Sequence, residues 1–295
     1  MLSFKDIEIN DQEWAKPMIA AGNLPACEYS FGSNFIWSKA YHVQIAQVEG
    51  MYVAKAGREE ISFTFPVGGG DLKACVDKLA GYAREQGQPL RFHAVVESSR
   101  QKLEELYPGQ FSFTSQRDSF DYIYNSQDLI NLTGKKYHGK RNHINRFREG
   151  NWLFEPITPD NLSECMEMQK EWCVLNDCKN NCSKQAEACA VEAAFAHFFE
   201  LGFQGGLLRL DGKVVAYTIG EPLNSNTYVV HIEKAYADVQ GAYPAINQEF
   251  ARYAASEYSF INREDDTGAE GLRKAKLSYR PAIILKKYRA TWLGD

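Results

Sequence analysis

Three consecutive acids near the C-terminus, Glu264, Asp265 and Asp266, stand directly before a turn and a short helical pattern. Adjacent carboxylates raise one another's pKa, which suits a general base, and they can also bind the ammonium group of a substrate. The alternative is structural, because acids near a helix N-terminus stabilise the helix by about 0.3–1 kcal/mol each. One acid would suffice for that purpose, so three of them favour a catalytic or ammonium-binding cluster.

A second candidate base, Glu233, lies in the strand-like segment NTYVVHIEKAY, two residues after His231. Side chains two residues apart on a strand point to the same face. Two interpretations of Glu233 stay open: a base that removes the acceptor's proton, and a partner in an ion pair on an exposed edge. His231 is a candidate substrate contact, although a single histidine on a strand is more often a hydrogen-bonded core residue.

Two glycine turns stand between a strand-like and a helical segment, where free backbone N–H groups can bind phosphate. In the first, Gly68-Gly69-Gly70-Asp71, the aspartate would repel an anion and is also a good helix N-cap. The second turn has no such acid, and we expect it to bind a pyrophosphate. Its candidate cofactor-binding residues are Gln240, Gly241, Ala242, Tyr243 and Ala245. Glycine turns before helices are common, so each motif is weak by itself.

The net charge of −5 conceals two cationic stretches. Residues 135–148 contain six Lys or Arg, two His and no acid, and residues 273–289 contain seven Lys or Arg and no acid. Such stretches in an acidic protein indicate a local anionic ligand rather than a general coating of nucleic acid. In the second stretch, Arg273 and Lys276 lie three residues apart, so they share a helix face and can clamp a phosphate or a carboxylate.

The first cationic stretch has helical character and two interpretations. It is either a solvated linker helix or a helix that lines the substrate cleft, with Lys140, Arg141 and Asn142 as candidate substrate contacts. If aminoacyl-tRNA were the donor, residues 135–148 would be its electrostatic footprint.

Composition limits the class of protein. A chain of 295 residues, 44% hydrophobic and 24% charged, is typical of a globular protein with one large domain or two ordinary ones. The sequence has no run of 18 apolar residues and its first residues include acids where a signal peptide is apolar, so we expect a cytoplasmic protein without a transmembrane segment. Five of the seven cysteines lie between residues 165 and 189 without a CxxC pair, which favours reduced thiols over a metal site.

Alternation and helical periodicity divide the first half into a helical N-terminal region, a three-stranded meander, and then helix, strand, helix and strand. These segments cover residues 41–67, 71–87, 90–96, 97–107 and 118–125. The second half opens with helices at 159–173 and 186–202 and then repeats the order of meander, glycine turn, helix, strand, helix and strand. Its hairpin turns at Asp211-Gly212, and its last segments cover 226–236, 242–258, 259–262, 268–279 and 281–292. The repeated order predicts an α/β fold of two tandem halves, residues 1–150 and 151–295, with mixed sheets flanked by helices.

The segment Glu270-Gly271-Leu272-Arg273, followed by Lys276, Tyr279 and Pro281, resembles the G-L-R-x-x-K-x-x-aromatic-x-Pro signature of the phosphatidylglycerol lysyltransferase C-terminal domain family. The match is specific at residues 264–281 and 135–147 and diffuse elsewhere. The strand–turn–helix–strand order of the second half resembles the GNAT acyltransferase fold. The resemblance implies two GNAT-like halves and acyl or aminoacyl transfer, with the turn at Gln240–Ala245 holding the pyrophosphate of acyl-CoA and Tyr279 among the substrate contacts.

We therefore expect a transferase that moves an acyl or aminoacyl group to an amine or hydroxyl acceptor. The turn at Gln240–Ala245 narrowly favours acyl-CoA as the donor, whereas the cationic stretches favour aminoacyl-tRNA. The partners would then be a small-molecule or CoA substrate and, with the second donor, tRNA. The alternative is a non-catalytic sensor of a CoA thioester or nucleotide, built on a degenerate tandem transferase fold.

Overall fold

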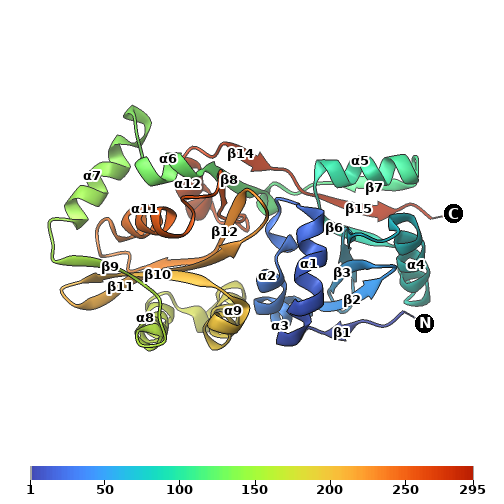
Figure 1. The fold of residues 1–295 in the computed structure, drawn as a ribbon, viewed down its shortest axis with the longest axis horizontal. Coiled ribbons are helices and arrows are strands. Elements are labelled where there is room, and N and C mark those ends of the chain that lie inside the picture. The colour runs from blue at the N-terminus through green and yellow to red at the C-terminus, as the bar shows by residue number, and fades with distance from the viewer. Residues whose placement is uncertain (1, 295) are drawn as a thin grey trace. The chain divides into compact units, whose positions relative to one another are not determined.

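The computed structural model describes residues 2–294, which form two compact α/β units (Figure 1). Unit 1 contains the residues up to Asp121, the segment Asp265–Arg273 and the residues from Ile284 onward. Unit 2 contains Tyr122–Glu264 and Lys274–Ile283. The compact units thus divide after Asp121, whereas a boundary between transferase-like halves near residue 150 stays a prediction.

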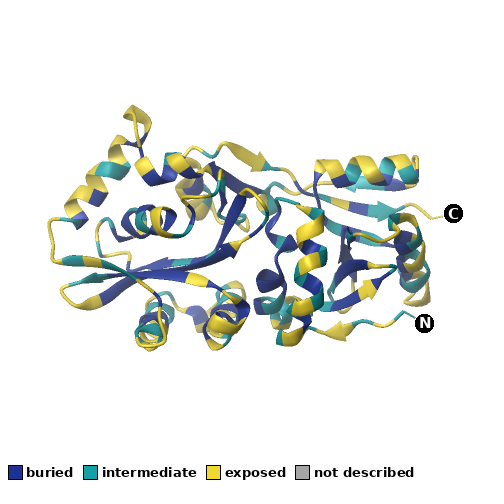
Figure 2. Cartoon of the chain, in the orientation of Figure 1, coloured by how far each residue is buried: buried dark blue, intermediate teal, exposed yellow. Residues whose placement is uncertain are grey.

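Unit 1 is built on a mixed sheet in the order β1-β2-β3-β4-β6-β15-β7, with β5 also paired to β3. The strand pairs of this sheet are antiparallel except that of β4 with β6. The strands are β1 (Lys5–Asp6), β2 (Gln44–Val48), β3 (Met51–Ala56), β4 (Ser62–Thr64), β5 (Val67–Gly68), β6 (Arg91–Val95), β7 (Phe111–Thr114) and β15 (Tyr288–Trp292). The helices are α1 (Gln12–Gly22), α2 (Phe31–Ile36), α3 (Ser38–Tyr41), α4 (Leu72–Glu85) and α5 (Glu97–Leu106). The central strands are largely buried (Figure 2). Their large side chains Tyr52, Phe63 and Phe92 are completely buried.

The first glycine turn, ahead of α4, has a structural role. The Oδ1 atom of Asp71 accepts a hydrogen bond from the N–H of Ala74 at 3.0 Å and so caps α4. A Cβ atom on Gly70 would lie 1.8 Å from the carbonyl oxygen of Glu49, so only glycine fits there. The helix N-terminus is therefore occupied by its own cap.

Unit 2 is built on a seven-stranded mixed sheet in the order β14-β8-β13-β12-β11-β10-β9. The strands are β8 (Asp121–Asn125), β9 (Trp152–Pro156), β10 (Gln204–Leu210), β11 (Lys213–Pro222), β12 (Thr227–Ala235), β13 (Phe260–Asn262) and β14 (Ile283–Leu285). The helices are α6 (Ser126–Asn131), α7 (His138–Phe147), α8 (Leu162–Leu175), α9 (Cys182–Ala196), α10 (Phe198–Leu201) and α11 (Ala242–Ala254), together with α12 (Glu270–Ser278), whose first four residues belong to unit 1. Helix α11 covers one face of the sheet, and α8 and α9 lie on the other (Figure 1). Short 3-10 turns occur at Ile9–Asp11, Cys27–Tyr29, Arg117–Ser119, Lys135–Tyr137 and Cys178–Asn180.

The closing strand of each half of the sequence belongs to the sheet of the other unit. Strand β8 follows the helices of unit 1 but pairs with β13 of unit 2. Strand β15 is the last of the described strands but lies between β6 and β7 of unit 1. The predicted strand at 281–292 is therefore two strands, β14 and β15, in different sheets. Within residues 2–294, no helix combines the length and the apolar character needed to cross a membrane.

A buried ion cluster fixes β15 in unit 1. The Nζ atom of Lys287 lies 2.7 Å from Asp121 and 2.6 Å from Glu28, and the side chains of Lys287 and Asp121 are 2% and 0% exposed. Burial opposes a charge on Lys287, but the neighbouring carboxylates outweigh it and hold its pKa well above the usual value. The ammonium group lies among Cys27, Glu28 and Asp121. The sulfur of Cys27 and one carboxylate oxygen of each acid lie within 4.8 Å of one another.

Replacing Lys287 with Ala leaves Asp121 buried without its cation. We expect the free energy of unfolding to fall by about 3–5 kcal/mol, because removing one partner of a buried pair strands the other charge. Urea denaturation followed by circular dichroism measures the loss, with Lys286→Ala at the exposed neighbouring position as the control. Equal stability of the two variants would contradict a structural role for the cluster.

Candidate functional site

Strand β12 carries His231 and Glu233 and is irregular at this point. Its ladder with β11 pairs Ile232 with Ile219 and Val230 with Gly220, so His231 is an extra, bulged residue. On the other edge, the ladder with β13 joins only residues 227–229 of β12 to residues 260–262. A bulge bends a strand and re-aims its side chains, and bulges are common beside active sites. After residue 229, β12 no longer pairs with β13.

Glu233 lies in a buried ion pair. Its Oε1 atom accepts a hydrogen bond from Nη2 of Arg263 at 2.7 Å, and its Oε2 atom accepts one from Nδ2 of Asn247 at 3.0 Å. The two charged side chains are 12% and 11% exposed. Nη1 of Arg263 is buried without a hydrogen-bond partner, so one donor of the guanidinium group is available to a ligand. Burial alone would lower the pKa of Arg263. The negative charge of Glu233 outweighs this effect, so the pKa of Arg263 lies above its usual value.

Two further sequence candidates, Lys140 and Tyr279, meet beside this pair. Nζ of Lys140 lies 4.0 Å from the ring centroid of Tyr279, and the Arg263 guanidinium carbon lies 4.9 Å from the same centroid. Burial and the charge of Arg263 lower the pKa of Lys140 to about 8, against the opposing effect of Glu233. Lys140 therefore changes its protonation state close to neutral pH.

Lys276, in the signature segment of α12, holds the backbone of Arg263. The Nζ atom of Lys276 is buried and donates a hydrogen bond to the backbone carbonyl of Arg263 at 2.5 Å. The hydroxyl of Tyr124 donates to the carbonyl of Lys276 at 2.8 Å, and that of Tyr137 donates to the carbonyl of Tyr279 at 3.0 Å. Lys276 thus holds the backbone at the site, in contrast to the phosphate clamp that we expected from its sequence position.

The acids at 264–266 have separate partners. Oε1 of Glu264 lies 2.8 Å from Nδ1 of His231, whose Nε2 lies 3.1 Å from Oε1 of Glu221. The His231 side chain is fully buried. Burial disfavours its protonation, but the two carboxylates outweigh burial and raise its pKa to about 9. His231 is therefore a charged residue that links the bulge of β12 to the segment after β13.

Asp265 and Asp266 belong to unit 1, where they shape the turn before α12. Oδ1 of Asp265 accepts a hydrogen bond from the N–H of Thr267 at 3.1 Å. The fully buried Asp266 accepts two hydrogen bonds from Arg273, from Nε and Nη2, both at 2.8 Å. Arg273 also pairs with Asp118 at 2.6 Å, and these hydrogen bonds to the two carboxylates raise its pKa. Asp266 and Arg273 thus neutralise one another in a structural pair.

The second glycine turn lies against the cationic helix α7. Gly241 has a φ of 87°, and a Cβ atom there would lie 2.1 Å from the carbonyl oxygen of His143. Nη1 of Arg146 donates to Oε1 of Gln240 at 3.2 Å. The N–H of Ala242 bonds to the carbonyl of Val239, and Pro244 has no N–H. Of the other turn residues, Ala245 is buried and Tyr243 is 36% exposed.

The remaining α7 candidates make local contacts. Nη1 of Arg141 donates to the carbonyls of Leu132 and Gly134, the second at 2.7 Å. Nδ2 of Asn142 lies 3.1 Å from Nε2 of His138, one helical turn earlier. Their role as substrate contacts stays a prediction.

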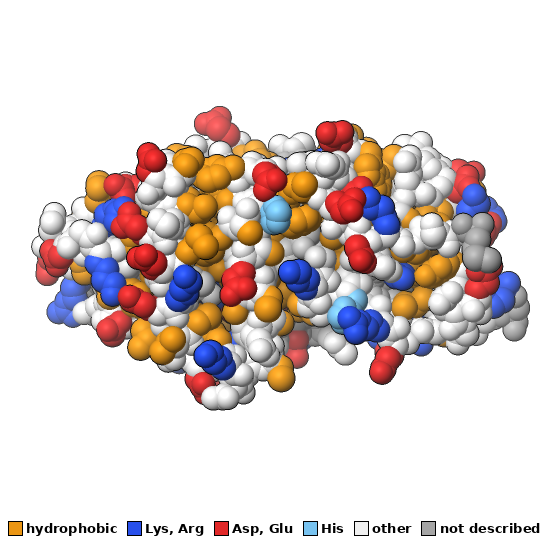
Figure 3. Space-filling view, turned by 90° about the horizontal axis from the view of Figure 1, so that it is seen from below, with side chains coloured by type: hydrophobic (Ala, Val, Ile, Leu, Met, Phe, Trp, Pro, Cys, Tyr) orange, Lys and Arg blue, Asp and Glu red, His pale blue; other side chains and the backbone are white. Residues whose placement is uncertain are grey.

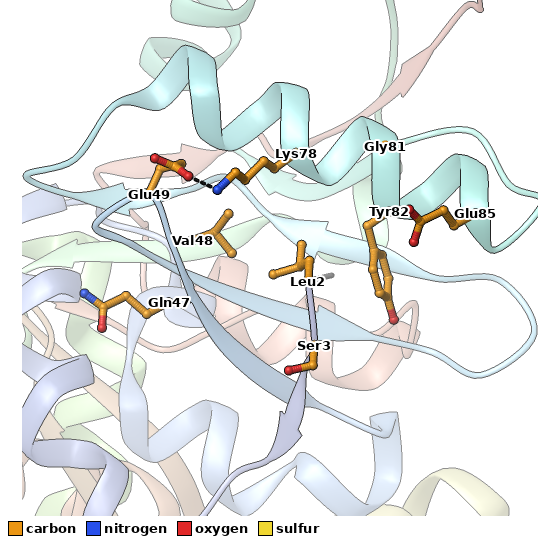
Figure 4. Close-up of a pocket in the computed structure, with 9 residues that line it drawn as sticks. All are labelled: Leu2, Ser3, Gln47, Val48, Glu49, Lys78, Gly81, Tyr82 and Glu85. Atoms are coloured by element: carbon orange, nitrogen blue, oxygen red, sulfur yellow. Dashed lines mark ion pairs between the residues drawn. The ribbon is translucent and has the colours of Figure 1, made fainter.

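A surface hollow of about 500 Å³ in unit 1 is lined by none of these residues (Figure 4). It is lined by the N-terminal Leu2 and Ser3, by residues of β2 and by α4. Figure 4 draws one ion pair there, between Lys78 and Glu49, and the two charges compensate one another. The hollow has none of the features that distinguish the Glu233 site.

The His231 contacts predict a pH dependence of stability. Because the pKa is raised in the folded state, the stabilisation is complete below the unfolded value near 6.5 and is lost as the pH rises through about 9. We expect His231→Gln to lower stability at pH 6 by up to roughly 3 kcal/mol and to differ little from the parent chain at pH 10. Urea denaturation at both pH values measures this, with His197→Gln as the control on an exposed histidine. A difference that does not shrink with pH would contradict the charged state.

Comparisons with known proteins show the family of this chain. A model of the family described as phosphatidylglycerol lysyltransferase, C-terminal, matches residues 22–291. An uncharacterised protein of Mycoplasmoides gallisepticum is 24% identical over 178 residues, which are 58% of this chain and only 55% of that relative's length. A crystal structure of a conserved protein of unknown function from Bacteroides thetaiotaomicron is 41% identical, has a TM-score of 0.95, and aligns over 99% of this chain and all of that one.

More distant structures show the fold alone. L-PGS from Bacillus licheniformis is 13% identical with a TM-score of 0.73, over 100% of this chain and 95% of that one. A tandem GNAT protein from the clavulanic acid biosynthesis pathway is 10% identical with a TM-score of 0.50, over 99% and 98% of the two chains. The predicted α/β fold of tandem GNAT-like halves is thereby confirmed, and so is the resemblance drawn from the signature at 264–281. This chain belongs to the family of phosphatidylglycerol lysyltransferase C-terminal domains.

Proposed function

We propose that this protein is an aminoacyltransferase, with aminoacyl-tRNA as the donor and an amine or hydroxyl group as the acceptor. The observation that carries the proposal is the meeting of Glu233, Arg263 and Lys140 around Tyr279, at the end of a bulged strand. Family membership supports the same class, since the family's description names a lysyltransferase. Such a site supplies a carboxylate, a free guanidinium donor and an amine that titrates near neutrality.

The surroundings of Gly241 favour tRNA over acyl-CoA. A pyrophosphate at a helix N-terminus needs free N–H groups, yet here the carbonyl oxygen of His143 faces the turn and Pro244 lacks a donor. Helix α7 exposes His143 and Arg146 along the same edge, where they suit a polyanionic backbone. The face of the molecule shown in Figure 3 carries acidic and basic side chains mixed together, in contrast to the purely cationic stretch of α7.

The proposed reaction is attack of the acceptor on the ester carbonyl carbon that joins the amino acid to the ribose of tRNA. The carboxylate of Glu233 takes the proton of the attacking amine or hydroxyl. Nη1 of Arg263 stabilises the negative oxygen of the tetrahedral intermediate, because a buried, unpaired donor is strongest in a site of low dielectric. Protonated Lys140 gives its proton to the departing ribose oxygen, which matches a pKa of about 8. The new amide or ester forms as the bond to tRNA breaks.

Replacing Glu233 with Gln keeps the shape of the side chain and removes the base. We expect transfer from labelled, bulk aminoacylated tRNA to a pool of small amines and alcohols to fall by about 100-fold or more, with tRNA affinity unchanged within about twofold. Glu257→Gln, at an exposed position, is the matched control. Wild-type turnover by Glu233→Gln would exclude it as the base, and tRNA binding without any turnover of the parent chain would favour the sensor alternative.

Replacing Arg146 with Ala tests the donor surface. We expect weaker binding of bulk tRNA and a smaller salt dependence, with the slope of log affinity against log salt reduced by about one, because one phosphate contact is lost. Fluorescence anisotropy at several salt concentrations measures both, with Lys170→Ala on the exposed side of α8 as the control. A rise in melting temperature with CoA and none with tRNA would return the proposal to acyl-CoA.

A further inference from the structure

Helix α8 ends in a left-handed cap that brings two cysteines together. The helix stops at Leu175, and Asp177 follows with a φ of 51°. The N–H of Asp177 bonds to the carbonyl of Val174 at 3.3 Å, which is one of the two hydrogen bonds of a Schellman motif. In this motif the third residue from the helix end contacts the second residue beyond the cap. Those positions are Cys173 and Cys178.

The side chains agree with the contact that the backbone predicts. Cys178 is 5% exposed and Cys173 is partly exposed, and the Cys178 thiol is near enough to help raise the pKa of Cys173. Nε2 of Gln169 also donates to Sγ of Cys173 at 3.3 Å. Caps of this kind frequently place two hydrophobic side chains here, whereas this chain places two thiol groups that can be joined covalently.

We propose that Cys173 and Cys178 form a dithiol modification site, which a low-molecular-weight disulfide oxidises to an intrachain disulfide. In the first step the thiolate of one cysteine attacks the small disulfide, forming a mixed disulfide and releasing one small thiol. In the second step the other cysteine attacks the protein sulfur of the mixed disulfide, and the second small thiol leaves. Two protein thiols lose two protons and two electrons, and the small disulfide gains both.

The surroundings set the rate of this chemistry. Burial, together with the nearby Cys178 thiol, raises the pKa of Cys173 to about 12. Because the thiolate is the attacking species, attack by Cys173 is slow at neutral pH and accelerates as the pH rises. The second step is fast by comparison, since the cap holds the two sulfurs together. Cys182 and Cys189 are exposed and have no such neighbour in this cap, so they stop at the mixed disulfide.

The modified turn is attached to the end of β12. Nε1 of Trp172, the residue before Cys173, donates to the carbonyl of Ala235 at 3.1 Å. The Nζ atom of Lys234 lies 4.0 Å from the Trp172 ring and pairs with Glu187 of α9 at 2.6 Å. A disulfide at the end of α8 would therefore fix the residue next to Trp172, whose indole contacts Ala235, two residues after Glu233. The disulfide itself does not depend on the proposed transferase activity.

The chain offers a direct test, because trypsin separates the cysteines. Cleavage after Lys170 and Lys179 releases residues 171–179 with both Cys173 and Cys178, whereas Cys182 and Cys189 fall on two other peptides. After incubation of the folded protein with oxidised glutathione at pH 8.5, we expect peptide 171–179 to lose two hydrogen atoms in mass. The peptides with Cys182 and Cys189 should carry glutathione.

Matched variants separate the pair from its neighbours. Cys173→Ser and Cys178→Ser should each abolish the intrapeptide bridge, and Cys189→Ser should leave it as in the parent chain. The proposal is overturned if peptide 171–179 stays reduced while Cys182 and Cys189 become glutathionylated, or if Cys178 is joined to Cys182 instead.

Discussion

The candidate site depends on one buried charge, that of Arg263, and on how it is compensated. A guanidinium group with 11% exposure is stable only with a partner, and Glu233 provides the carboxylate. The rings of Tyr124 and Tyr279 flank the group, and Lys276 fixes its backbone carbonyl. Most of the residues that make the site distinctive are there to hold this cation in place.

This arrangement gives a physical meaning to the family signature. The Arg of G-L-R, Arg273, closes the turn before α12 by pairing with Asp266. The Lys and the aromatic residue that follow, Lys276 and Tyr279, lie against Arg263 by backbone and ring contacts. The signature therefore builds a support for a residue outside it. The three acids 264–266 likewise have three different tasks: Glu264 pairs with a histidine, Asp265 holds a turn and Asp266 binds an arginine.

The elements could be predicted well from the sequence, because periodicity, caps and glycine turns are local signals. The hairpin at Asp211-Gly212 and helices α4, α11 and α12 follow these signals directly. Strands β7 and β9 were missed, since both are short and lack a clear alternation of buried and exposed residues. Among the residues proposed from the sequence, Glu233, Lys140 and Tyr279 lie near one another, and Arg263, which joins them, was missed. Its only signal was an arginine directly before the acids, and pairing with Glu233 needs β12 and β13 as neighbours, which is not a local property.

The exchange of β8 and β15 between the two sheets ties the folding of the protein to its synthesis. During translation, unit 1 has β6 and β7 long before β15, the strand that lies between them, leaves the ribosome. Until then each of these two strands presents an unpaired edge, and closing the gap requires contacts across about two hundred residues of chain. The nascent protein must therefore keep its first sheet open until the strand Tyr288–Trp292 has been made, and a cell would have to protect that opening from association with other chains.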